Sequence, residues 1–253
     1  MNLSFPKHLL QRDALILICS FGILSFFIPI GGRIDQLLMQ PWINSMGQFY
    51  LNDNWYLNYW NHDIFKYILI FVYSIFLFLW IFSFFIPKLK SQRFLYAYMF
   101  LMSGISTALI GFMKSQSSHA CPINMLQDSS RGLIWDFSST NGHCFPGGHA
   151  STGFALMTGF FVFRLSRHKY ASMFLMVGLG TGFILGWGQM MRGQHFLSHN
   201  LWSAWIIYAA NSAVFALLAY KFPEKLQPIP QNHPRINLLI NPLENVLQRS
   251  KNQ

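Results

Sequence analysis

Histidines, cysteines and one lysine are gathered in three short polar segments of the sequence. The segments are Lys114 followed by Cys121-Pro122, then Cys144-Phe145-Pro146-Gly147-Gly148-His149, and finally Arg192 to His199 with His195 between them. Glycines allow a backbone to approach a ligand closely, and the N–H groups that begin a helix attract anions. The segments therefore indicate an anion site, although a snorkelling lysine, a structural turn and a polar interfacial loop are the plainer interpretations of each alone.

The composition excludes an ordinary soluble domain. The 253 residues are 53% hydrophobic and 17% aromatic but only 10% charged, whereas a soluble domain carries roughly a quarter charged residues. The net charge of +10 is distributed between long apolar runs. We therefore expect basic loops that contact anionic lipid headgroups, and no nucleic-acid partner.

Six apolar runs are long enough to approach the roughly 20 residues that a membrane helix needs. They are Asp13–Ile30, Lys66–Ile86, Phe94–Met113, Ala150–Leu165, Tyr170–Met191 and Asn200–Tyr220. None has an acidic residue in its interior, as expected from the cost of burying a carboxylate in lipid. The sequence thus predicts an all-α polytopic membrane protein, a six-helix bundle over residues 1–221, and a proline-rich tail over 222–253 without chemistry.

The distribution of lysine and arginine predicts the orientation. Most lie in the tails and on the side of the termini, and the opposite side has only Arg33, Lys66, Lys114, Arg131 and Arg192. The positive-inside rule then places both termini in the cytoplasm and the three polar segments at the periplasmic or exterior face of the inner membrane. Residues 31–65 are rich in aromatic side chains and suggest an outer interfacial anchor, with a role in substrate access as the alternative.

The order of the three segments resembles the type 2 phosphatidic acid phosphatase superfamily. Its pattern is Lys, six residues, Arg-Pro, then Pro-Ser-Gly-His, then Ser-Arg, five residues, His, three residues, Asp. The resemblance extends from the third to the sixth predicted span, with the site loop at 114–149.

The resemblance implies a role for each matching residue. His195 matches the nucleophile that forms a phosphohistidine, and His149 matches the general acid that protonates the leaving alkoxide. Lys114 matches a phosphate-binding cation, while Gly147 and Gly148 would supply N–H donors. Fixed cations and N–H groups around the phosphoryl oxygens are what phosphoryl transfer needs, so no metal or other cofactor is implied.

Several positions depart from the family pattern. Cys121 stands for arginine, Gly147 for serine, Gly188-Gln189 for Ser-Arg, and His199 for aspartate. Arg192 lies about one helical turn from the missing arginine, and its long guanidinium could reach a phosphate. A neutral His199 could accept a hydrogen bond from His195 in place of the aspartate.

Two hypotheses concern the loop between the first two segments. Arg131 is its only other cation and could replace the missing arginine, although a solvated loop arginine is the alternative. Cys121 and Cys144 would form a disulfide in an oxidising compartment, with two free thiols as the alternative.

The favoured function is a membrane phosphatase that hydrolyses a phosphomonoester or diphosphate of a lipid at the outer leaflet. The lipid could be an isoprenyl phosphate or diphosphate, phosphatidate, phosphatidylglycerol phosphate or a lipid A phosphate, and the sequence does not choose among them or predict an oligomeric state. Two alternatives are an inactive lipid-binding carrier or scaffold of the same fold, and a metal site that uses His195 and His199 with His149 or His119.

Overall fold

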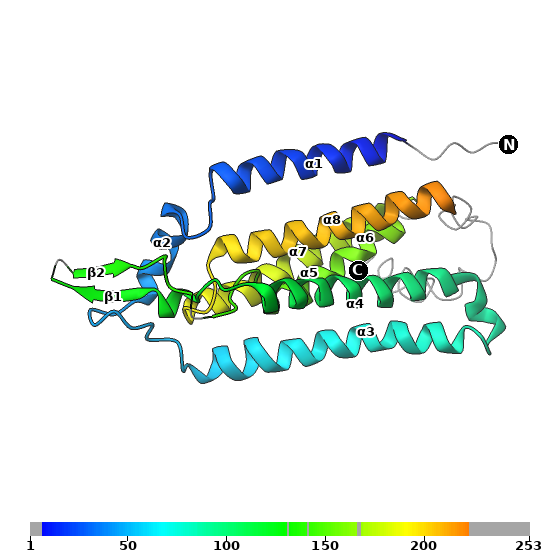
Figure 1. Cartoon of the computed structure of the whole chain (residues 1–253). Helices are drawn as coiled ribbons and strands as arrows, with labels where there is room; N and C mark the ends of the chain where they lie inside the picture. Colours follow the sequence, from blue (N-terminus) through cyan, green and yellow to red (C-terminus); the bar gives the residue numbers. More distant parts are fainter. Residues whose placement is uncertain (1–6, 131, 141, 166–167, 223–253) are drawn as a thin grey trace, which may run out of the picture.

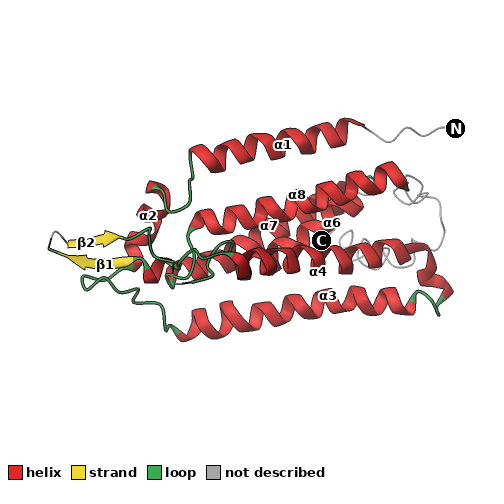
Figure 2. Ribbon diagram, viewed as in Figure 1, coloured by secondary structure: helices red, strands yellow, loops and turns green. Residues whose placement is uncertain are grey.

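The computed structural model describes residues 7–130, 132–140, 142–165 and 168–222. Long helices run side by side as a bundle, and one end of it carries a short helix and a β-hairpin (Figures 1 and 2). We call this end, with α2 (Arg33–Met39), the site end. Arg131 and the tail after residue 222 lie outside the described residues.

Five helices are long and apolar enough to cross a membrane, so the chain is a membrane protein. Their regular parts are α1 (Lys7–Phe26), α3 (Phe65–Phe82), α4 (Arg93–Gln116), α7 (His168–Met191) and α8 (Leu197–Lys221). The helix of α3 is extended at its start by a π-helical segment, Tyr56–Ile64. The predicted run at Lys66 therefore begins ten residues too late.

The fourth predicted span is helical but broken. It consists of α5 (Gly148–Phe154), a 3₁₀ turn at Ala155–Met157, and α6 (Thr158–Phe163). Glycines let this segment lie directly against α7, since a Cβ on Gly153 would come within 2.5 Å of the Gly182 nitrogen. The segment is too short to count among the five long helices, so a sixth crossing stays a prediction.

One expectation about the first span is wrong. Helix α1 begins at Lys7, which places Asp13 inside it, and that carboxylate is buried at 1% exposure. Arg164, at the end of α6, forms an ion pair with Asp13 at 2.6 Å. The hydroxyl of Tyr208 donates to the other carboxylate oxygen at 2.9 Å. A carboxylate can be buried here because its charge is paired and hydrogen-bonded.

The site end contains the structure that the sequence pattern did not predict. Strands β1 (Leu126–Ser129) and β2 (Gly132–Trp135) form one short antiparallel hairpin in a protein that is otherwise mostly helical, as predicted. Short 3₁₀ turns occupy Gln40–Trp42 and Pro122–Asn124 at this end, and another, Pro87–Gln92, joins α3 to α4 at the opposite end.

A small apolar core joins the parts of the site end. Met39 of α2, Met125 beside β1 and Phe196 before α8 pack into one buried cluster with Phe49. Phe49 was expected at the membrane interface, but it lies against Gly193, where a Cβ would fall 2.5 Å from its ring. This core fixes the turn between α7 and α8 against α2 and the hairpin.

Candidate active site

His195 lies in the turn between α7 and α8 and is almost completely buried, at 2% exposure. Its Nδ1 is 2.8 Å from the carbonyl oxygen of Cys144. Because a carbonyl oxygen only accepts hydrogen bonds, Nδ1 carries the proton and donates it. The Nε2 atom then keeps its lone pair, as a nucleophile requires.

Burial, together with charge repulsion from the nearby Lys114 and His149, lowers the pKa of His195 to about 3. The imidazole is therefore neutral at neutral pH. A neutral imidazole is the nucleophilic form, so the surroundings that bury this side chain also keep it reactive.

Lys114 and the Gly148-His149 turn lie together beside His195. Lys114 is in the last turn of α4, and its Nζ lies 3.6 Å from the position a Cβ on Gly148 would take. His149 is in the first turn of α5. The segments that contain Lys114 and His149 thus lie beside the segment that contains His195, although the three residues are at the ends of different helices.

The N–H groups of Gly147 and Gly148 differ in their hydrogen bonding. The Gly147 N–H already donates to the carbonyl oxygen of His199 at 3.2 Å. Of the pair that was expected to bind phosphate, only Gly148 keeps its N–H for a ligand in the described structure. A bound phosphate would therefore have one glycine N–H donor here, together with Lys114.

A disulfide joins Cys121 to Cys144, whose Cα atoms are 5.0 Å apart. Cys144 also donates its N–H to the carbonyl oxygen of His119 at 2.9 Å and accepts from His195. One residue therefore links the loop after Lys114 to the imidazole of His195.

His199 is fully buried in the first turn of α8, within a group of rings. Its ring centroid lies 5.1 Å from that of His119, 5.3 Å from Phe196 and 5.5 Å from Phe145. Its Nδ1 is 3.4 Å from Nδ1 of His195, which is farther than the Cys144 carbonyl oxygen at 2.8 Å. The Cys144 carbonyl is therefore the principal hydrogen-bond acceptor for His195.

Arg192 does not share a helical face with the two histidines, because residues 192–196 form a turn rather than a helix. Its Nε donates to the carbonyl oxygen of Asn52 at 3.0 Å, and one terminal nitrogen donates to Gln189 at 3.3 Å. Burial lowers the pKa of the guanidinium, and Asp53 and Asp63 oppose that shift. Phosphate binding by Arg192 remains a prediction, as it does for Arg131.

Asp35 is a site residue that the sequence did not reveal. Its buried carboxylate accepts the N–H of Ser198 at 3.0 Å, the Ser198 hydroxyl at 2.5 Å and the Gly31 N–H at 2.9 Å. Helix α8 begins at Leu197 without a side-chain cap of its own, and Asp35 supplies an acceptor for its first turn from α2. Burial raises the pKa of Asp35, which its hydrogen bonds to Ser198 oppose.

Two asparagines occupy the space of the serines that the family pattern contains. A Cβ on Gly147 would fall 2.6 Å from Oδ1 of Asn200, and a Cβ on Gly188 would fall 2.4 Å from Oδ1 of Asn61. Each glycine therefore leaves room for an amide from another part of the chain. Neither asparagine could be assigned from local sequence, because the contact depends on how the helices pack.

Several buried polar atoms around the histidines have no hydrogen-bond partner among the described residues. They are Nε2 of His119, Gln189 and His199, and Oδ1 of Asn200. Such atoms are rare in native proteins and often face a water or a ligand. The described residues include no group of three His, Cys, Asp or Glu side chains arranged for a metal ion.

One family model matches more than half of the chain. The model of the PAP2 superfamily matches residues 92–226. The chain belongs to the PAP2 superfamily. Neither the curated proteins nor the solved structures gave a match.

PAP2 superfamily members are generally phosphatases, so membership indicates phosphatase-type activity. The matched region begins at the start of α4 and includes Lys114, His149 and His195. The segment with α2 precedes it, so Asp35 lies outside the matched region.

Proposed function

We propose that this protein hydrolyses a phosphate ester or diphosphate of a membrane lipid through a phosphohistidine on His195. The observation that carries the proposal is the meeting of Lys114, His149 and a buried, neutral His195 at one end of the bundle. The PAP2 membership supports the reaction class, and the five long apolar helices support a substrate in the membrane.

In the first step, Nε2 of His195 attacks phosphorus and the bond to the lipid oxygen breaks. His149 donates a proton to the departing alkoxide, and Lys114 and the Gly148 N–H stabilise charge on the phosphoryl oxygens. The proton on Nδ1 of His195 stays hydrogen-bonded to the Cys144 carbonyl, which holds the ring in place.

In the second step, water attacks the phosphohistidine and inorganic phosphate leaves. His149, now deprotonated, takes a proton from that water, as the reverse of its first role requires. His195 recovers its Nε2 lone pair, and the site returns to its starting state.

We further propose that α5 and α6 form a sixth crossing and that both termini are cytoplasmic. The short crossing would be shielded from lipid on one side by α7, against which it packs closely at Gly153. The site end would then lie at the outer leaflet of the inner membrane, level with lipid headgroups. The positive-inside distribution of lysine and arginine supports this orientation.

The test is phosphate release by detergent-purified protein from a panel of lipid phosphates. We expect His195→Ala to lower the rate at least about 10³-fold, while His8→Ala, a change of an exposed histidine near the start of α1, leaves it unaltered. Chelators should have no effect. Absence of turnover by the unaltered protein on every lipid would contradict the proposal and favour a carrier of the same fold.

A further inference from the structure

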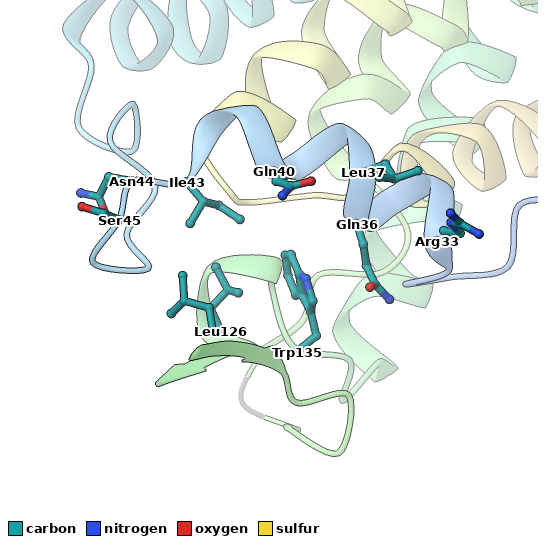
Figure 3. Close-up of a pocket in the computed structure, with 10 residues that line it drawn as sticks. Arg33, Gln36, Leu37, Gln40, Ile43, Asn44, Ser45, Leu126 and Trp135 are labelled. Atoms are coloured by element: carbon teal, nitrogen blue, oxygen red, sulfur yellow. The ribbon is translucent and has the colours of Figure 1, made fainter. Parts of the chain in front are cut away.

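The described structure has cavities of two kinds. At the site end, a cavity of ≈ 540 Å³ lies between α2 and the β-hairpin, where Arg33 and Gln36 are opposite Trp135 (Figure 3). The buried core that contains Phe196 lies between this cavity and His195. The second kind is a groove in the membrane-spanning part of the bundle. Its walls are apolar, so it suits a ligand of a different chemical class.

The groove runs between α1 and the pair of helices α7 and α8. It has two parts, of ≈ 430 Å³ and ≈ 280 Å³, and both are lined by Ile16, Leu179, Ala204 and Tyr208. Because the two parts share these walls, they form one continuous groove. Helix α1 lies at the edge of the bundle in Figure 1 and packs against α8. Ile16 stays 42% exposed, so the groove is open to the surrounding membrane.

The polar groups along the groove already have partners within the protein. The Trp205 indole N–H donates to the carbonyl oxygen of Leu17 at 3.1 Å, and the Tyr208 hydroxyl donates to Asp13 at 2.9 Å. The Ser20 hydroxyl donates to a backbone carbonyl of its own helix. The other lining side chains of α1, α7 and α8 along the groove are apolar. A ligand there needs no hydrogen bonds, as is true of a hydrocarbon chain.

The dimensions of the groove fit one lipid chain better than a helix. The groove follows α1 from Arg12 to Leu24, which is about 18 Å at the helical rise per residue. The hydrocarbon layer of one leaflet is about 15 Å thick, half of the bilayer core. A helix of about 10 Å diameter would fill roughly 1,400 Å³ over that length, about twice the volume of the two parts together. An extended acyl chain therefore fits where a helix does not.

Arg12 gives one end of the groove a positive charge. This residue is exposed near the start of α1, and its guanidinium lies 5.9 Å from the Phe160 ring centroid. Among the described residues no carboxylate forms a salt bridge with it, since the neighbouring Asp13 is paired with Arg164. A long basic side chain near a helix end reaches the lipid headgroups, and a guanidinium binds phosphate oxygens through two parallel N–H donors.

We infer that the groove binds one acyl chain of an anionic phospholipid, with the lipid phosphate at Arg12. The lipid belongs to the leaflet nearest the start of α1, at the end of the bundle opposite the site end. The inference goes beyond the proposed function and does not depend on it, because His195 is at the other end. A bound lipid of this kind would stabilise the packing of α1 against α7 and α8.

The experiment measures thermal unfolding of delipidated protein in detergent, with added phosphatidylglycerol or with phosphatidylcholine that has the same acyl chains. We expect phosphatidylglycerol to raise the midpoint about 5 °C more than phosphatidylcholine does, relative to the same protein without lipid. Arg12→Gln should remove that difference. Lys169→Gln is the matched control, because Lys169 is exposed at the same end but does not line the groove, and it should retain the difference.

A second pair of variants tests the groove itself. Ala204→Phe places a ring where the two parts join, and Ala213→Phe is its control, because Ala213 is exposed on the same helix outside the groove. Native mass spectrometry should show one retained phosphatidylglycerol on the unaltered protein and on Ala213→Phe, and none on Ala204→Phe. His195→Ala should also retain the lipid, which separates this binding from binding at the candidate active site.

Equal stabilisation by the two lipids, or an undiminished preference for phosphatidylglycerol in Arg12→Gln, would overturn the inference. A lipid-free dimer that Ala204→Phe abolishes would overturn it too, since a second copy of the chain would then occupy the groove. If Ala204→Phe does not fold, the comparison of Arg12→Gln with Lys169→Gln still decides. Absence of phosphatase activity would contradict the proposed function and would leave these binding results unchanged.

Discussion

The two ends of the bundle bury polar side chains of different kinds. At the end away from the site, which we call the anchor end, Asp13 and Arg164 are each 1% exposed and form an ion pair, and Tyr208 donates to the same carboxylate. The other two guanidinium nitrogens of Arg164 have no hydrogen-bond partner in the described structure. At the site end, Nε2 of His199 and of Gln189 are buried without a hydrogen-bond partner among the same residues. The anchor end therefore buries a pair of opposite charges, whereas the site end buries neutral polar groups that a ligand could bind.

The largest expected effect on stability comes from breaking the anchor end. Arg164→Met leaves the Asp13 carboxylate buried without its ion pair, which should lower the free energy of unfolding by about 3–5 kcal/mol. Thermal unfolding in detergent measures the loss, and phosphate release per folded molecule should be retained. Lys90→Met, which removes an exposed cation from the same end, should shift stability by less than about 0.5 kcal/mol.

A double change sharpens this prediction. Asp13→Leu combined with Arg164→Met removes both charges, so most of the lost stability should return. A double variant that is as unstable as Arg164→Met alone would contradict this prediction, because it would show that the ion pair does not stabilise the packing of α1.

The sequence predicted the parts of both ends that depend on local pattern. Apolar runs located the helices, and residue type and spacing selected Lys114, His149 and His195. Asp13 was expected at the first position of its span rather than inside the helix, because no local signal marks a partner 151 residues away. Asp35, Asn61 and Asn200 were missed for the same reason, since each acts through a contact that exists only after the helices pack.

The next effect tests the packing of the site end. Gly147→Ser restores the residue of the family pattern, but its Cβ would meet Asn200. We expect a loss of about 1–3 kcal/mol from overpacking, together with lower phosphatase activity. Asn200→Ala should relieve the contact, so the double variant should recover stability, as unfolding measurements would show. A stable Gly147→Ser protein with an unchanged rate would contradict the role given to Asn200.

A smaller effect on stability is expected from changes at Asp35. This carboxylate is buried and fully hydrogen-bonded, yet it positions the helix that carries His199. Asp35→Ala should lower stability by about 0.5–2 kcal/mol through loss of the helix cap, and kcat more than KM. Asp35→Asn, which keeps an acceptor oxygen, should restore part of kcat, whereas Asp128→Ala on the exposed hairpin should affect neither quantity.

The smallest effect concerns pH. Since the pKa of His195 is lowered to about 3, the ring should stay neutral between about pH 7.5 and 5, where an ordinary histidine becomes protonated. Its NMR signal, assigned as the one missing from His195→Ala, should not titrate over that range. A signal that titrates near pH 6.5 would contradict the prediction, because it would show that water reaches the His195 ring.

The same shift has a consequence for stability, with a definite sign. A histidine whose folded pKa lies below its unfolded pKa contributes stability above the unfolded value of 6.5 and loses it as the pH falls toward 3. His195→Phe should therefore flatten the decline in stability on acidification. A decline identical to that of the unaltered protein would mean that other groups cause it.

The disulfide between Cys121 and Cys144 makes one part of the candidate site depend on a reaction that follows synthesis of the chain. A chain that has just entered the membrane has all its helices, yet the loop after Lys114 and the carbonyl that holds His195 are joined covalently only after two thiols have lost their hydrogens. The covalent link between these two segments therefore depends on an oxidising compartment as well as on the fold.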